Sequence, residues 1–444
     1  MAVSKTNHDQ GRLFQARLSE QLNLENRFIV LAKKLDWKKL EEDLGCFYIK
    51  KGPGQPAKPI RLMVGLLMVQ HMEKLSDEGT LRFFQENVYC QAFCGYDYLQ
   101  KEAPIDATSL IRFRNRIGKA GMDKILAMTV KQAVKHKVIK KKDLQKVVAD
   151  TTAMPKNIQH PSDARLLDKV RRDIVVLAKK QKIPLRQNYN RLGKKTLLKS
   201  GRHGHAKQFK RMQRCIKTLR TYLGRVIRDV ERKISTSEEL KELFAPLLDS
   251  SKKILTQRKD TKNKVYSIHE PHVYCIAKGK ARKPYEFGSK VSFITTQNKG
   301  LILTANCLEK NDYDGHTLKP SLYNAEKLNE ITIREILVDQ GYKKHGIIDK
   351  KVYMSGQKKG LTYYLKRRLD KRSSVEAHIS HMKNDGKLSV NFLKGRKGDE
   401  INAVLCAIAH NLRIIINNNY AILKWAIIAF FSYKQMYRFK FPFL

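Results

Sequence analysis

The hydrophobic positions of the first 140 residues recur mainly with helical spacing. The segment 59–75, PIRLMVGLLMVQHMEKL, is apolar on most sides and starts with proline, which predicts a buried helix. Ser76 then resembles a helix cap before a second helix. In residues 106–130, two short amphipathic patterns are broken at Gly118 and Gly121, and arginines alternate with apolar residues. This region fits either a helix-turn-helix-like DNA module or a plain helical subdomain with a solvated basic face.

The pattern changes near residue 144, where short apolar runs replace the helical periodicity. The run LQKVVAD predicts a buried strand whose last residue is Asp150, and REILVD predicts a second strand that ends in Asp339. The remaining elements are predicted as a hairpin of residues 290–296 and 300–308, a helix at about 317–328, a helix carrying Glu376, and a core helix at 399–416. This alternation of strands and helices predicts an α/β core after residue 140.

A very basic insertion, about residues 165–262, separates the two predicted aspartate-bearing strands. Its first part, residues 164–201, has an irregular pattern, whereas the apolar positions of 212–234 predict a long helix with a partner helix after it. Residues 165–220 contain 19 Lys or Arg and two acidic residues, which leaves +17 over 56 residues. Such an excess of one charge is unfavourable without a partner of opposite charge.

We therefore interpret the insertion as a contact surface for DNA ends or for a second subunit. Arg211, Arg214 and Lys217 flank the apolar stripe of its long helix and are the predicted phosphate contacts. The alternative is a solvated basic face without a defined ligand.

The composition of the whole chain supports a polyanionic partner. The chain of 444 residues carries 89 Lys or Arg against 42 Asp or Glu, a formal net charge of +47. Nucleic acid is the commonest partner for such a chain, and the spread of basic residues argues against a membrane surface. The seven cysteines are scattered, and the first residues lack the apolar core of a signal peptide. We expect a cytoplasmic, nucleoid-associated protein that does not bind membranes.

Three carboxylates are candidates for chemistry. Asp150 and Asp339 end neighbouring strands, where side chains project into one crevice of an α/β sheet. Glu376 lies on a later helix, within roughly a 40° arc of Arg372 and Lys383. Oxygen donors of this kind suit Mg²⁺ and two-metal phosphodiester chemistry. Taken singly, each aspartate could cap a loop, and Glu376 could form a simple surface pair with Arg372.

These motifs resemble those of bacterial insertion-sequence DDE transposases, in the branch with a Tyr-Arg-Glu-Lys signature. VVADTT resembles the segment of the first family Asp, ILVDQGYKKH resembles that of the second, and Arg372, Glu376 and Lys383 have the spacing of the signature. Further similar blocks are DYDGHTL, NFLKGRKGDEINAVL and KPIRLMVGLLMVQHMEKLSDE. The resemblance covers about residues 20–417. One position departs from it, because Leu369 stands where the signature has Tyr.

The resemblance implies a helical, DNA-binding N-terminal domain (residues 1–140) and a catalytic core (residues 141–440). The core would be a ribonuclease-H-like mixed sheet interrupted by the basic insertion. Asp150, Asp339 and Glu376 would hold two Mg²⁺, or Mn²⁺ in their place.

The same resemblance implies the reaction and its partners. Water would cut double-stranded DNA at the element ends, and the freed 3′-hydroxyl would attack target DNA. Arg372 and Lys383 would neutralise phosphates, and action on two ends favours a homodimer on DNA. Two alternatives stay open: a DNA-binding protein derived from a transposase without catalysis, and a ribonuclease-H-like nuclease.

Overall fold

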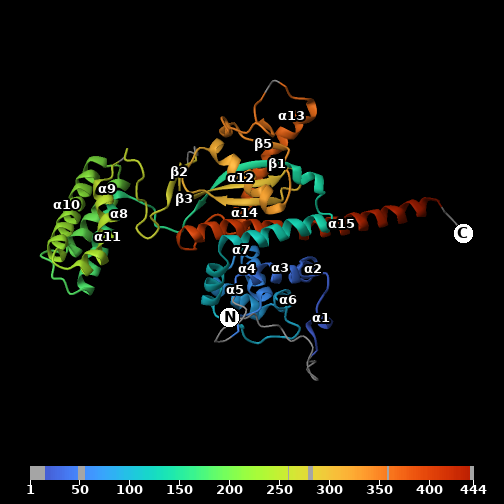
Figure 1. The fold of residues 1–444 in the computed structure, drawn as a ribbon, viewed down its shortest axis with the longest axis horizontal. Helices are drawn as coiled ribbons and strands as arrows, with labels where there is room; N and C mark the ends of the chain where they lie inside the picture. Colours follow the sequence, from blue (N-terminus) through green and yellow to red (C-terminus); the bar gives the residue numbers. More distant parts are fainter. Residues whose placement is uncertain (1–15, 49–55, 259, 279–283, 358–359, 441–444) are drawn as a thin grey trace. The chain divides into compact units, whose positions relative to one another are not determined.

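The protein has a mixed α/β fold that divides into two compact units. The computed structural model describes residues 16–48, 56–258, 260–278, 284–357 and 360–440, with side chains described up to residue 418. One unit comprises residues 1–155 and 290–444, and the other comprises residues 156–289 (Figure 1). Across this described part of the chain, no helix combines the length and apolar character needed to span a bilayer.

The first unit begins with packed helices. They are α1 (Leu18–Gln21), α2 (Arg27–Lys34), α3 (Trp37–Gly45), α4 (Ile60–Met72), α5 (Asp77–Glu86), α6 (Val88–Phe93) and α7 (Ala107–Lys135). Nearly every residue of α4 is buried, which confirms the predicted core helix. The predicted cap is also confirmed, because the Ser76 hydroxyl accepts a 2.9 Å hydrogen bond from Gly79 N at the start of α5. The predicted domain boundary at residues 140 and 141 falls within this unit and stays a prediction.

Helix α7 spans the region interpreted as either a helix-turn-helix-like DNA module or a plain helical subdomain with a solvated basic face. It is kinked at Gly118, whose φ of 53° is in the left-handed region that favours glycine. Arg114 does not face solvent: its guanidinium forms two hydrogen bonds with the Asp77 carboxylate, at 2.7 and 2.6 Å, and its side chain is buried. Arg114 therefore stabilises the packing of α7 against α5 and is not available to a DNA phosphate.

The sheet of the first unit is mixed. Its strands are β1 (Lys146–Pro155), β3 (Tyr285–Thr296, which begins in the second unit), β4 (Ile302–Cys307), β5 (Glu335–Val338) and β6 (Lys351–Met354). Their order is β4-β3-β1-β5-β6, with β3 and β4 antiparallel and with β5 parallel to both β1 and β6. The predicted hairpin is confirmed as β3 and β4. The short 3₁₀ turns η1 (Lys141–Gln145) and η2 (Gln340–Tyr342) precede β1 and follow β5.

Helices cover both faces of this sheet. On one face, α12 (Asp314–Asn329) and α15 (Gly395–Lys440) pack with α7 against a core that contains Val147 and Ala149 of β1 (Figure 1). On the other face, Val148 and Leu337 pack against residues of α13 (Tyr363–Asp370) and α14 (Ser374–Asn384). The predicted helices at 317–328 and 399–416 are confirmed as α12 and the first part of α15.

The second unit is built around four helices with their own core. They are α8 (Asp163–Lys180), α9 (Asn190–His205), α10 (Phe209–Ile234) and α11 (Glu238–Thr256), and a short strand, β2 (Tyr274–Ala277), pairs with the start of β3. The long helix and its partner are confirmed as α10 and α11. The irregular pattern assigned to residues 164–201 was wrong. Leu167, Val170 and Ile174 form a buried helical stripe, which the dense Lys and Arg residues between them concealed.

Candidate active site

The parallel pairing of β1 with β5 sets two candidate aspartates side by side. Val148 of β1 is the register partner of Leu337 in β5. Asp150 and Asp339 each lie two residues further along, and side chains alternate between the faces of a strand. Both carboxylates therefore lie on the sheet face that α13 and α14 cover.

The two aspartates differ in their position relative to the strand ends. Asp339 directly follows β5, which ends at Val338, one residue before its predicted end. The prediction that Asp150 ends its strand was wrong, because β1 continues to Pro155. The strand continues because Ala153 and Met154 are buried apolar residues that extend the core beyond Asp150.

Arg372 links the carboxylates of this face. It lies in a 3₁₀ turn, η3 (Lys371–Ser373), and the predicted helix that carries Glu376 is confirmed as α14, which starts at Ser374. Arg372 Nη2 is 3.6 Å from Asp339 Oδ1 and 3.8 Å from Glu376 Oε1. The Arg372 side chain is only 10 % exposed, against 70 % for Glu376. Because the Arg372 guanidinium is buried and also lies near Asp339, its contact with Glu376 is not a simple surface ion pair.

The electrostatic environment of Asp150 disfavours its charged form. Burial is the main cause that raises the pKa of Asp150 to about 6, and the nearby Asp339 and Asp314 carboxylates add to the increase. Arg372 and a 2.8 Å hydrogen bond from Thr151 N act in the opposite direction. Asp150 therefore carries a full negative charge only above about pH 6.

Asp339 has the opposite perturbation. The Ser355 hydroxyl donates a 2.7 Å hydrogen bond to Asp339 Oδ1, and this bond is the main cause that lowers the pKa of Asp339. The charge of Arg372 lowers this pKa further. Two neighbouring carboxylates thus differ in how readily they accept a proton.

A second polar cluster, which the sequence pattern did not predict, lies near Asp150. The Thr151 hydroxyl donates a 2.7 Å hydrogen bond to Asp314 Oδ1, and Lys290 Nζ lies 2.6 Å from the same oxygen. Asp314 is the first residue of α12 and belongs to the DYDGHTL motif. The DYDGHTL motif is the only feature of the sequence that marks Asp314. The sequence does not show that the Thr151 side chain points toward α12. Tyr342 is buried nearby, and burial raises its pKa well above the usual value.

The side chains on this face that could hold a hard cation such as Mg²⁺ are carboxylates. Carboxylate oxygens are the ligands that this ion prefers, and a positive charge would favour the ionised form of the buried Asp150. Within the residues that the structure describes, no three His, Cys, Asp or Glu side chains are gathered into a ready ligand group. Asp339 and Glu376 are 52 % and 70 % exposed and are arranged around Arg372, so both side chains have room to reorient.

The other predicted contact residues lie on two elements. Lys383 is a half-buried residue near the end of α14. Arg211, Arg214 and Lys217 are exposed on α10 of the second unit, and Arg211 Nη1 donates a 3.2 Å hydrogen bond to Gln208 Oε1. Their exposure is compatible with binding to a polyanion.

Leu369, the position that departs from the motif of the resembled transposases, is a core residue. It is 8 % exposed and packs with Val148, Leu337 and Val375. A tyrosine hydroxyl at this depth would need a polar partner in an apolar cluster. Two tyrosines on the same helix, Tyr363 and Tyr364, are instead 78 % and 64 % exposed.

Comparison with known proteins relates the chain to transposases. Residues 16–116 match the family described as Transposase domain (DUF772). The chain is also 39 % identical over 209 residues to the uncharacterized protein ORF8 in the nfe locus of Rhizobium meliloti. That match covers 47 % of this chain and 100 % of the Rhizobium protein. No solved structure has significant similarity to the chain.

Proposed function

Since the chain belongs to the transposase family that these similarities define, we propose that it is a DDE transposase of an insertion sequence. It would cut double-stranded DNA at the ends of its element and join the 3′-hydroxyl ends to target DNA. One observation carries the proposal: the parallel register sets Asp150 beside Asp339, and Glu376 reaches the same buried guanidinium as Asp339.

The sheet supports a ribonuclease-H-like core. An antiparallel hairpin, β3 and β4, lies on one side of β1, and the parallel strands β5 and β6 lie on the other. Gln297 N donates a 3.0 Å hydrogen bond to Lys146 O, which joins the end of β3 to the start of β1. The carboxylates of Asp150 and Asp339 lie on one face of this sheet, a rigid scaffold on which a functional site is positioned more accurately than on a loop.

The proposed cofactor is a pair of Mg²⁺ ions, or Mn²⁺ in their place, held by Asp150, Asp339 and Glu376. When bound, such ions activate the attacking oxygen and stabilise the leaving oxygen of a phosphodiester. Asp150 must be ionised to serve as a ligand, so its pKa of about 6 favours activity above that pH. Arg372 is held by Asp339 and Glu376 in the same region and would neutralise the phosphate being cut. Lys383 would add a second positive charge further along α14.

The proposed partners are element ends and target DNA, bound by a homodimer in the nucleoid. The net charge of +47 supports a polyanionic partner. Arg211, Arg214 and Lys217 are proposed contacts of the second unit with DNA, because all three are exposed on one helix.

The test is an assay of cleavage and joining with the full-length protein, Mg²⁺ and DNA that carries the element ends. We expect the wild type to cut and join, and Asp339→Asn to do neither while it keeps its fold and its DNA affinity. Asp312→Asn is the matched control, because it removes one exposed negative charge from the loop before α12. It should stay active.

Each other outcome assigns a different function. DNA binding without any cleavage by the wild type would favour a DNA-binding protein derived from a transposase. Cleavage without joining would favour a nuclease. Activity in Asp339→Asn equal to that of the control would remove Asp339 from the proposed site.

A further inference from the structure

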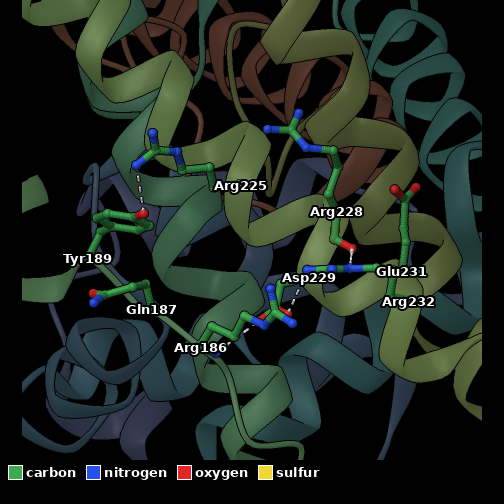
Figure 2. Close-up of a pocket in the computed structure, with 8 residues that line it drawn as sticks. All are labelled: Arg186, Gln187, Tyr189, Arg225, Arg228, Asp229, Glu231 and Arg232. Atoms are coloured by element: carbon green, nitrogen blue, oxygen red, sulfur yellow. Dashed lines mark hydrogen bonds and ion pairs between the residues drawn. The ribbon is translucent and has the colours of Figure 1, made fainter.

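A cavity of about 550 Å³ lies in the second unit, next to the C-terminal half of α10 (Figure 2). The segment between α8 and α9 forms its other side, through Arg186 and Tyr189. The volume is within the range of small-molecule and cofactor sites, roughly 300–1,000 Å³. Four of the residues that line the cavity are arginines.

The helical period explains why α10 presents its arginines together. Arg225, Arg228 and Arg232 are spaced by three and four residues, so they lie along one face of the helix. Val226 and Val230 are buried in the core of the unit. The apolar stripe thus anchors α10 and leaves the arginines exposed around the cavity.

The acidic residues of the cavity already have partners. Asp229 is buried, and its Oδ2 accepts a 2.9 Å hydrogen bond from Arg186 N and a 3.2 Å hydrogen bond from Lys233 Nζ. Arg232 Nη2 donates to the other oxygen at 3.2 Å. Glu231 is 2.7 Å from Lys252 Nζ on α11. Neither carboxylate is therefore left to neutralise a further arginine.

Three guanidinium groups remain around one cavity. Among the carboxylates that the structure describes, none forms an ion pair with Arg186, Arg225 or Arg228. Arg225 Nη1 instead donates a 3.2 Å hydrogen bond to the Tyr189 hydroxyl (Figure 2). The Tyr189 ring is stacked on Tyr222, with 4.3 Å between ring centroids and 12° between planes. The stacked tyrosine therefore holds Arg225 in place at the cavity.

We propose that this cavity binds a backbone phosphate of DNA, an inference that rests on the proposed function. Like charges around one cavity repel each other, and an anion between them removes that cost. The planar fork of arginine can donate two parallel hydrogen bonds to phosphate oxygens. The guanidiniums come from two segments of the chain, so a phosphate would connect Arg186 with Arg225 and Arg228. This site is separate from the contacts proposed for Arg211, Arg214 and Lys217, which lie in the first half of α10.

The experiment compares the DNA affinity of full-length variants by fluorescence anisotropy at several salt concentrations. Arg225→Gln/Arg228→Gln removes two cavity charges, and Arg165→Gln/Arg202→Gln removes two exposed arginines that do not line the cavity. We expect the cavity variant to bind DNA roughly ten- to a hundredfold more weakly than the wild type. We also expect its plot of log K against log salt to become shallower by about one for each phosphate that it no longer binds. The control should change much less in both respects.

A second variant and a second probe make the test specific. Arg225→Lys/Arg228→Lys keeps both charges but replaces each planar guanidinium with an ammonium group, which cannot donate two parallel hydrogen bonds. We therefore expect a weaker complex with DNA and a nearly unchanged salt slope. Inorganic pyrophosphate is the free-phosphate probe, titrated into the wild type by calorimetry. Circular dichroism checks that each variant is folded.

The outcomes separate this inference from the proposed function. Equal losses of affinity in the cavity and control variants would show an effect of net charge alone and would overturn the cavity site, with DNA binding by the wild type left intact. A second result would also overturn the proposed DNA site. If the wild type binds pyrophosphate tightly and the cavity variant does not, while both bind DNA equally well, the cavity is a site for a free phosphate ligand. Absence of DNA binding in the wild type would reject both the proposed function and this inference.

Discussion

Replacement of Asp150 by asparagine should stabilise the folded protein while it abolishes the proposed catalysis. Asparagine has nearly the same size, and its Oδ1 can still accept the hydrogen bond that Thr151 N donates to Asp150. It removes only the negative charge, which is buried and lies near the Asp339 and Asp314 carboxylates. The ionised Asp150 carboxylate therefore raises the free energy of the folded protein but not that of the unfolded chain, which lowers the free energy of unfolding.

The magnitude follows from the pKa of Asp150. An ordinary aspartate has a pKa of about 3.8, and that of Asp150 is about 6 in the folded chain. This difference corresponds to about 3 kcal/mol of unfolding free energy. Below about pH 3.8 both states are protonated, so asparagine makes no difference there. Above about pH 6 the Asp150 carboxylate of the folded wild type is ionised and its full destabilising effect is present. The gain in unfolding free energy with asparagine is therefore largest there.

The assay is thermal unfolding at pH 8 and pH 4.5, in EDTA so that no divalent cation binds. For Asp150→Asn we expect a Tm about 3–5 °C above that of the wild type at pH 8, and a much smaller difference at pH 4.5. Asp339→Asn is the matched control. Its carboxylate is half exposed, and its pKa is lowered by the Ser355 hydroxyl, so asparagine should not stabilise the protein there. An Asp150→Asn variant less stable than the wild type at pH 8 would refute the reasoning.

Three further predictions concern other parts of the first unit. Glu376→Gln should keep its DNA affinity in a gel shift but lose metal-dependent cleavage by orders of magnitude; cleavage near the wild-type rate would exclude Glu376 as a ligand. Arg114→Met should lower the unfolding free energy in urea by about 3–5 kcal/mol, because it leaves Asp77 without its buried partner; a decrease below about 1 kcal/mol would contradict this. Burial lowers the pKa of His71 to about 3, so stability should fall as the pH drops from about 6.5 toward 3, when the unfolded chain gains a proton. In this pH range the stability of the wild type should change by about 1.4 kcal/mol per pH unit, and His71→Gln should abolish that dependence. Urea midpoints that vary with pH in the same way in both proteins would refute the prediction.

The sequence by itself determined the elements whose signals are local. Apolar residues on most sides of α4, the Ser76 cap and the hairpin of β3 and β4 depend on neighbouring residues in the chain, and all three are confirmed. The same holds for α10, whose apolar stripe repeats every three or four residues. Periodicity was less informative for α8, because closely spaced Lys and Arg residues hide a stripe of the same kind.

Only the tertiary structure decided which side chains meet. Asp150 and Asp339 are neighbours because β1 and β5 pair in one parallel register, and a shift of one residue would turn either carboxylate to the opposite face. The sequence marked both aspartates through their motifs, but it could not supply that register.

Burial and long-range partners are likewise tertiary properties. Arg114 and Arg372 occur among many exposed basic residues, yet packing buries both beside carboxylates that are distant in the sequence or on another element. Asp314 reaches Thr151 across 163 positions of the chain. The arginine cavity depends on the segment before α9 crossing α10. Charge and hydropathy patterns record which residues are present, but the environment of each charge depends on the residues that folding brings around it.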